Sequence, residues 1–266
     1  MDLPLVLCPR LDAPIVLAHG LFGFDRIGLG PVTVANYFRS LPSYLAAAGN
    51  RVLVAQVPAI AGIERRSRVL GRRIRAAFGG EPVHLIGHSM GGLDARALLA
   101  SEGDSGLILS LTTVGTPHLG SALADFAKIG FGRVYQLFSA LRIDHSGFLD
   151  ITRRTARSFH RLHPTPKAVP CFSVAGEPSH EDVCLPLRRL HAILDEAEGP
   201  NDGVVSVESA LAFGEPLPVW RIDHLRQVGW LAPRPGPSVI SLYLDILENL
   251  AACGFNGASA RVAIGF

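Results

Sequence analysis

The chain has 266 residues, of which 48% are hydrophobic and 18% are charged. An apolar fraction of this size excludes a disordered chain and predicts a folded domain with a large core. The formal net charge of +2 is too small to indicate a nucleic-acid partner. We interpret one basic cluster as the solvated face of a helix, and it consists of Arg65, Arg66, Arg68, Arg72, Arg73 and Arg75.

The cysteines and the first residues bear on metal binding and location. Cys8, Cys171, Cys184 and Cys253 lack the spacing of a zinc site, and a disulfide between Cys171 and Cys184 is possible but not indicated. The first residues carry no basic segment followed by a continuous apolar run, and no uncharged run reaches the ~18 residues of a membrane span. We therefore expect a cytoplasmic protein, although a secreted chain without its signal would read almost the same way.

Short apolar runs alternate with longer helical stretches, a pattern typical of a parallel sheet flanked by helices. The expected strands cover residues 15–18, 51–57, 83–86, 107–114, 169–175 and 217–222. The expected helices cover residues 34–48, 63–78, 90–101 and 238–251. We expect a single α/β domain over residues 1–266.

Residues 121–167 interrupt this alternation, because they contain no strand pattern between two strands that should be neighbours. Apolar residues recur there at helical spacing, among them Phe126, Phe131 and Phe138. One interpretation is a pair of core helices. The other is a helical lid over a binding site, which would bring these three phenylalanines against the substrate.

A strand pattern, the sequence Gly87-His88-Ser89-Met90-Gly91 and a helix pattern follow one another without a break. This G-x-S-x-G context predicts a sharp, strained turn that exposes the hydroxyl of Ser89 above the sheet. The flanking glycines leave room for that turn. We therefore predict that Ser89 is a catalytic nucleophile.

Acyl transfer on a serine needs two N–H donors where the carbonyl oxygen becomes negative. The residue after the nucleophile, Met90, is one candidate. The other is Leu21, in the His19-Gly20-Leu21-Phe22-Gly23 loop that follows the first predicted strand. We interpret His19 as a loop histidine bonded within its turn, because the catalytic base of such enzymes comes late in the chain.

The order serine, acid, histidine selects the base more clearly than the acid. His224 follows the last predicted strand and precedes the terminal helix, so it is the expected base. Several acidic residues lie between the preceding strand and His224. Topology favours Glu177, whereas Asp202 lies in an Asn-Asp-Gly turn that would hold a carboxylate in a fixed place.

Together these segments resemble the bacterial triacylglycerol lipase and esterase group of the α/β hydrolases. The resemblance rests on Ala18–Asp25, Gly87–Gly92, Thr113–Ser121, Glu198–Val207 and Asp223–Leu225, in the order of that family. It implies an α/β-hydrolase fold, a mostly parallel twisted sheet flanked by helices with a helical lid insertion. It also implies that Asp202 is the triad acid and that His118 is structural.

Two positions depart from the secreted members of that group. Those members bind calcium through an aspartate two positions after the catalytic histidine, where this chain has Arg226. They also form a disulfide from a cysteine six positions after the triad aspartate, where this chain has Glu208. The resemblance therefore implies a non-exported or calcium-independent branch, and we expect neither a metal nor another cofactor.

The expected activity is that of a serine carboxylic-ester hydrolase. A lipase that cleaves acylglycerol or fatty-acyl esters is favoured by the apolar insertion, with Phe22, Phe126, Phe131 and Phe138 as substrate contacts and transient contact with a lipid interface. The alternatives are a short-chain carboxylesterase and an acyltransferase on the same triad. A non-catalytic binding module is disfavoured because all three triad residues are present.

Overall fold

The structure is a computed structural model. It describes residues 5–22, 27–29, 32–35, 37–130, 144–231, 238–257 and 260–263. All structural statements below concern these residues.

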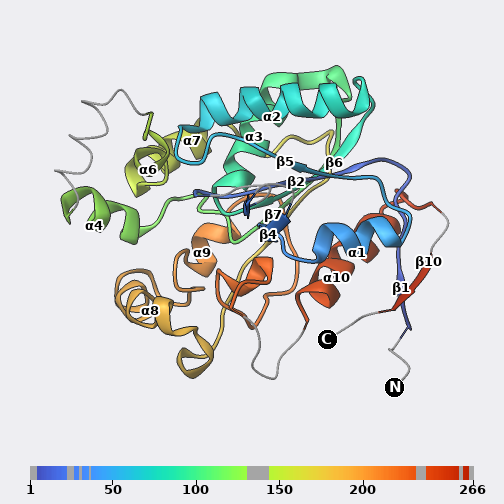
Figure 1. The fold of residues 1–266 in the computed structure, drawn as a ribbon. Helices are drawn as coiled ribbons and strands as arrows, with labels where there is room; N and C mark the ends of the chain where they lie inside the picture. Colours follow the sequence, from blue (N-terminus) through green and yellow to red (C-terminus); the bar gives the residue numbers. More distant parts are fainter. Residues whose placement is uncertain are drawn as a thin grey trace.

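Six strands form the central sheet in the order β5-β2-β6-β7-β8-β9, and every neighbouring pair is parallel. Figure 1 shows the sheet between its covering helices. The α/β fold expected from the sequence is confirmed. In chain order the strands are β2 (Ile15–Ala18), β5 (Val52–Ala55), β6 (Val83–His88), β7 (Ile108–Val114), β8 (Cys171–Val174) and β9 (Glu215–Pro216).

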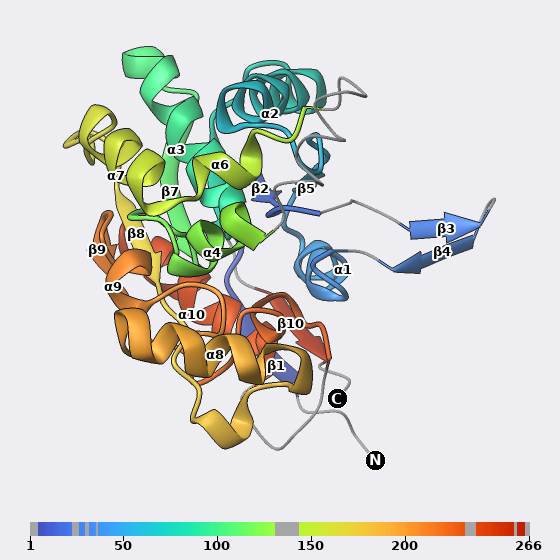
Figure 2. The ribbon, with the colours of Figure 1, turned by 90° about the vertical axis from the view of Figure 1, so that its left-hand side faces the viewer.

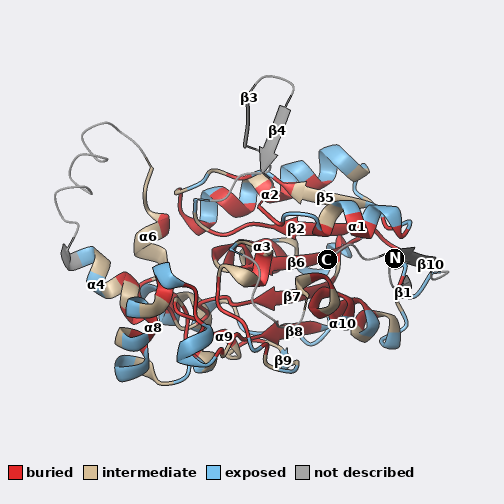
Figure 3. Ribbon diagram, turned by 60° about the horizontal axis from the view of Figure 1, so that its bottom comes forward, coloured by how far each residue is buried: buried red, intermediate tan, exposed pale blue. Residues whose placement is uncertain are grey.

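Helices cover both faces of this sheet, and each face has its own hydrophobic core. On one side lie α1 (Leu41–Ala47) and α10 (Val239–Ala252), and on the other lie α2 (Ile63–Phe78) and α3 (Met90–Glu102). Strand β2 serves both cores, since Ile15 and Leu17 face the first and Val16 and Ala18 the second. Buried residues fill the central strands in Figure 3.

The remaining elements lie around this centre. The terminal strands β1 (Leu5–Cys8) and β10 (Ala260–Ala263) pair antiparallel. A separate hairpin joins β3 (Ile27–Leu29) and β4 (Val32–Ala35), as Figure 2 shows. The 3₁₀ turn η1 (Gly103–Ser105) lies between α3 and β7. After β8 come, in chain order, the 3₁₀ turn η2 (His180–Asp182), the helices α8 (Leu185–Glu198) and α9 (Val207–Ala210), and the 3₁₀ turn η3 (Arg226–Val228).

Residues 121–167 hold three described helices, α4 (Ala122–Gly130), α6 (Gly147–Asp150) and α7 (Arg153–Leu162). Helix α6 is hydrogen-bonded to α2, because Asp150 Oδ2 accepts the Ile63 N–H at 2.8 Å. Helices α4 and α7 are joined by the Arg153 guanidinium, which donates to Asp125 Oδ2 at 2.6 Å. The role of this segment as a lid stays a prediction.

Two sequence predictions of secondary structure are wrong in part. The strand expected over residues 217–222 is not formed: β9 covers only Glu215–Pro216, just before that range, and the range itself holds one isolated bridge, from Trp220 to Gly176. Pro218 has no N–H and cannot donate to the ladder. The helix expected over 34–48 begins only at Leu41, since Pro42 stands in its first turn and the β-branched residues Val32–Val34 belong to β4.

Candidate active site

Ser89 lies in the turn between β6 and α3, with φ of 55° and ψ of −132°. Few residues other than glycine adopt a positive φ, so this turn is strained. Its neighbours have no room for side chains. A Cβ on Gly91 would lie 2.3 Å from the Ala18 carbonyl oxygen, and one on Gly87 would lie 2.6 Å from Gly92 Cα. The local geometry is that of a nucleophile elbow.

The loop after β2 lies directly against this serine. A Cβ placed on Gly20 would be 2.8 Å from Ser89 Cβ, so only glycine fits there. The next residues are Leu21 and Phe22, and the Phe22 N–H donates to the Ala59 carbonyl at 2.9 Å. Met90 is the first residue of α3, where a helix leaves its N–H groups without intrahelical acceptors. Both predicted oxyanion donors, Leu21 and Met90, therefore belong to segments beside Ser89.

The side chain of Arg66 is hydrogen-bonded to the same loop. Its guanidinium donates to the His19 carbonyl at 2.6 Å, to the Gly20 carbonyl at 3.2 Å and to the Pro58 carbonyl at 2.7 Å. Its Nε bonds Asp94 Oδ2 of α3 at 2.8 Å, and both side chains are fully buried. The interpretation of the arginine cluster as solvated is wrong for Arg66, because this residue lies on the buried stripe of α2 together with Ile63 and Leu70.

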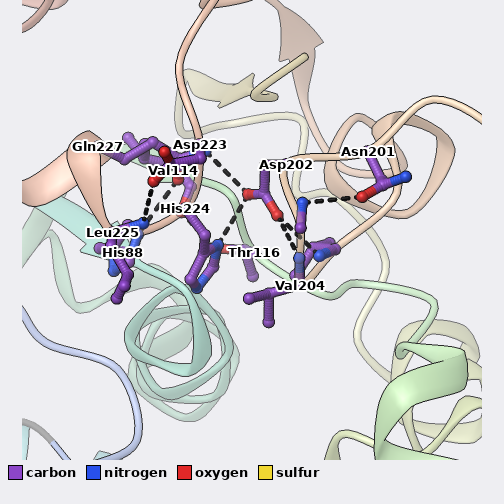
Figure 4. A network of polar contacts seen from close by, with 12 residues as sticks. His88, Val114, Thr116, Asn201, Asp202, Val204, Asp223, His224, Leu225 and Gln227 are labelled. Carbon is purple, nitrogen blue, oxygen red and sulfur yellow. Dashed lines mark hydrogen bonds and ion pairs between the residues drawn. The ribbon is translucent and has the colours of Figure 1, made fainter. Parts of the chain in front are cut away.

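Asp202 and His224 are in contact. The His224 Nδ1 lies 2.7 Å from Asp202 Oδ2, and both side chains are buried. The other carboxylate oxygen, Oδ1, accepts the N–H groups of Val204 and Val205 at 2.9 and 2.8 Å. Figure 4 shows the Asp202 carboxylate between His224 and Val204. The Asn-Asp-Gly turn thus holds the carboxylate toward the imidazole.

Glu177, the acid favoured by topology alone, is directed elsewhere. Its carboxylate pairs with the guanidinium of Arg221 at 2.9 Å on the protein surface. Residue spacing alone does not distinguish the two acids, because the difference lies in contacts between residues distant in sequence. The observed partner of His224 is Asp202.

Ser89 and His224 both line one cavity of about 1070 Å³. The other lining residues are mostly apolar and include Leu21, Phe22, Phe126 and Leu190. Phe22 and Phe126 are also 65% and 49% exposed, so they lie where the cavity meets solvent. The predicted contacts Phe131 and Phe138 lie outside the described residues.

Two other histidines of the motifs have structural partners. His19 is buried, with Nδ1 2.9 Å from the Gly20 carbonyl and Nε2 accepting the Val57 N–H at 3.3 Å. His118 is buried between Arg96 and Thr113, at 3.2 and 3.0 Å. Burial lowers the pKa of His118 well below its ordinary value, and the Arg96 guanidinium lowers it further. His118 is therefore neutral.

The residues near His224 do not fit the calcium site of the secreted lipases. The Arg226 guanidinium lies 3.4 Å from Asp223 Oδ2 and donates to the Asp182 carbonyl at 2.7 Å. Asp223 also accepts the N–H groups of Cys184, Leu225 and Arg226. A cationic side chain thus stands beside the carboxylate, and the described residues contain no cluster of three or more His, Cys, Asp or Glu suited to a metal.

Comparisons with known proteins agree with this geometry. A family model described as "alpha/beta hydrolase fold" matches residues 13–182. The chain is 27% identical to Triacylglycerol lipase 2 of Saccharomyces cerevisiae, over 91% of this chain and 92% of the yeast protein. It is 41% identical to a triacylglycerol lipase of Vibrio cholerae, but that match spans 43% of this chain and only 36% of the Vibrio protein.

Solved structures of low sequence identity share the fold. Staphylococcus hyicus lipase matches with a TM-score of 0.72 at 20% identity, covering 92% of this chain and 97% of that one. A metagenomic carboxyl esterase matches with a TM-score of 0.74 at 18% identity, covering 90% of this chain and 76% of that one.

Proposed function

Because the chain belongs to the alpha/beta hydrolase fold family, we propose that it is a serine carboxylic-ester hydrolase with Ser89, Asp202 and His224 as its catalytic triad. The observation that carries this proposal is the 2.7 Å contact between His224 and Asp202 beside the cavity that Ser89 lines. The names of the yeast and Vibrio relatives, both triacylglycerol lipases, support the same reaction class.

In the proposed mechanism, Ser89 Oγ attacks the ester carbonyl while His224 Nε2 accepts the serine proton. Asp202 keeps the imidazole in the Nδ1–H tautomer and stabilises the imidazolium. The N–H groups of Leu21 and Met90 would stabilise the oxyanion of the tetrahedral intermediate. The imidazolium then protonates the departing alcohol, and a water molecule activated by His224 releases the acid from Ser89.

We infer that the substrates are esters of long fatty acids. A cavity lined mostly by apolar side chains favours a lipidic acyl group, because each CH₂ moved from water into such a cavity contributes about 0.8 kcal/mol. The exposed rings of Phe22 and Phe126 would meet a lipid surface at the cavity mouth. None of the helices in the described part of the chain is long and apolar enough to span a membrane.

A chain-length profile tests this specificity. We expect kcat/KM for p-nitrophenyl esters from C4 to C16 to rise with chain length, and we expect Phe126→Ala to reduce the turnover of long esters more than that of short ones. Leu162→Ala is the matched control, since Leu162 is highly exposed on α7 and is not a lining residue of the cavity. A maximum at C4, unchanged by Phe126→Ala, would instead assign a short-chain carboxylesterase.

A further inference from the structure

Gln227 is a completely buried side chain three positions after His224. Its amide lies in a slot between two glycines that follow β7 and β8. A Cβ on Gly115 would lie 2.2 Å from Gln227 Oε1, and a Cβ on Gly176 would lie 2.3 Å from Gln227 Nε2. Both glycines therefore leave space for this amide, which gives Gly115 of the Thr113–Ser121 motif a physical role.

The amide joins the triad acid to the residue before the nucleophile. Gln227 Nε2 donates to Asp202 Oδ2 at 2.8 Å, the same oxygen that contacts His224 Nδ1. Gln227 Oε1 lies 3.1 Å from His88 Nε2. His88 and Gln227 are labelled beside Asp202 and His224 in Figure 4.

The contacts continue from His88 to the loop that carries Leu21. His88 Nδ1 lies 2.8 Å from the Tyr37 hydroxyl. That hydroxyl is packed against Gly20, since a Cβ on Gly20 would lie 2.9 Å from it and 2.8 Å from Ser89 Cβ. One buried chain of hydrogen bonds thus runs from Tyr37, beside the Gly20 loop, through His88 and Gln227 to Asp202.

The acid at one end of this chain fixes the direction of its bonds. The Asp202 carboxylate can only accept, so the Gln227 NH₂ group faces Asp202 and Gln227 Oε1 faces His88. His88 therefore donates Nε2–H to Gln227 Oε1, and its other nitrogen, Nδ1, accepts the proton of the Tyr37 hydroxyl. A flipped amide would place an oxygen against the carboxylate and another N–H against His88.

This arrangement requires His88 to stay uncharged. Burial lowers the pKa of His88 well below its ordinary value, and the proximity of His224 lowers it further. The two rings lie close together, with centroids 4.5 Å apart. A neutral His88 can accept from Tyr37 at one nitrogen and donate to Gln227 at the other.

We propose that Gln227 is a positioning residue for Asp202, and that Tyr37 and His88 hold its amide in the one orientation that donates to the carboxylate. This inference rests on the proposed triad. The Gln227 N–H fixes the rotation of the carboxylate and draws negative charge from the oxygen that contacts His224. It also couples the position of Asp202 to that of the loop beside Ser89.

Gln227→Met tests the role because methionine has nearly the same length and no hydrogen-bonding amide. We expect kcat to fall on the order of tenfold to a hundredfold, the range for losing a hydrogen bond to a charged group, with KM little changed. The acid limb of the kcat/KM profile should move to higher pH. Without the Gln227 hydrogen bond, Asp202 Oδ2 carries more negative charge and stabilises the protonated form of His224. A folded variant with unchanged kcat and an unchanged acid limb would overturn the proposal.

Asn50→Leu is the matched control for loss of a buried amide. Asn50 is also buried, and its amide bonds the Leu11 N–H and the Pro9 carbonyl away from the triad. We expect this variant to lower the unfolding midpoint without moving the acid limb. A shift of the acid limb in Asn50→Leu equal to that in Gln227→Met would attribute the effect to general destabilisation and reject the positioning role.

Tyr37→Phe tests the chain of bonds by removing a single hydroxyl. It should lower kcat and move the acid limb in the same direction as Gln227→Met. In the double variant Tyr37→Phe/Gln227→Met, the loss of kcat should not exceed the larger of the two single losses, because both changes act through the amide at position 227. Losses that multiply would contradict the coupling. Absence of phosphonate labelling on Ser89 in the unmodified protein would instead reject the triad itself, so the two failures are distinguishable.

Discussion

The guanidinium of Arg66, on α2, donates to the backbone carbonyl of His19 at 2.6 Å. The same side chain is paired with Asp94 on α3, the helix that starts directly after Ser89. One buried cation therefore connects α2, α3 and the loop that carries Leu21. Because oxyanion stabilisation depends on donors fixed in advance, Arg66 supports the proposed reaction without touching the substrate.

Arg66→Met should reduce both stability and activity. Leaving Asp94 buried without its partner should lower the free energy of unfolding by about 3–5 kcal/mol. The freed loop should also lower kcat for p-nitrophenyl esters roughly tenfold or more, the scale of a misplaced oxyanion donor. Urea unfolding and steady-state kinetics measure the two effects separately.

Arg75→Met is the control on the same helix. Arg75 pairs with Glu102 at a half-exposed site, so its loss should change stability by at most about 1 kcal/mol and leave kcat unaltered. If both variants behaved alike, the loop would not depend on the buried guanidinium.

Asp202→Asn and Glu177→Gln separate the two candidate acids. An amide at position 202 would favour the wrong histidine tautomer, so Asp202→Asn should lower kcat about 10⁴-fold with little change in folding. Glu177→Gln removes only an exposed contact with Arg221 and should retain nearly full activity. A large loss in the Glu177 variant would contradict the assigned acid.

Local sequence was sufficient for some features and insufficient for others. The helix over residues 63–78 is confirmed to the residue, and the strand before Ser89 and the helix after it are confirmed closely, because their patterns are local. Arg66 stands at helical spacing between Ile63 and Leu70, so its place on the buried stripe has a local signal. Its bonds to Asp94 and His19, and the contact of Gln227 with Asp202, depend on residues far away in the chain.

Arg226 leads to a prediction about metal dependence. We expect the protein not to need calcium, because the Arg226 guanidinium, held by Asp223 and the Asp182 carbonyl, places a positive charge beside the Asp223 carboxylate. Dialysis against EDTA and later addition of calcium should leave kcat and Tm unchanged. A fall in either value after EDTA treatment, reversed by calcium, would contradict this proposal.

Substituting Arg226 tests the same loop directly. Arg226→Gln should lower the free energy of unfolding by about 1–3 kcal/mol, because Asp223 is buried and loses its charged partner. Arg221→Gln, which breaks only the exposed pair with Glu177, should have an effect within about 1 kcal/mol. Thermal unfolding of both variants measures the difference.

The cysteines should differ sharply in reactivity. Burial raises the pKa of Cys8 to about 11 and that of Cys171 to about 12, so at pH 8 both remain thiols and poor nucleophiles. Cys184 is buried as well, and its pKa is also raised, whereas Cys253 is exposed. A thiol reagent such as DTNB should modify Cys253 in the native protein and the other three only after unfolding. If only two of the four cysteines reacted with DTNB after unfolding without a reductant, the other two would form a disulfide.

The central claim is that Ser89 becomes acylated. Incubation with a p-nitrophenyl alkylphosphonate should add one phosphonyl group to the intact protein, and peptide mass spectrometry should locate it on Ser89. The Ser89→Ala variant should take up no label and should lose p-nitrophenyl ester turnover. A label on another residue, or full ester turnover by Ser89→Ala, would contradict the account.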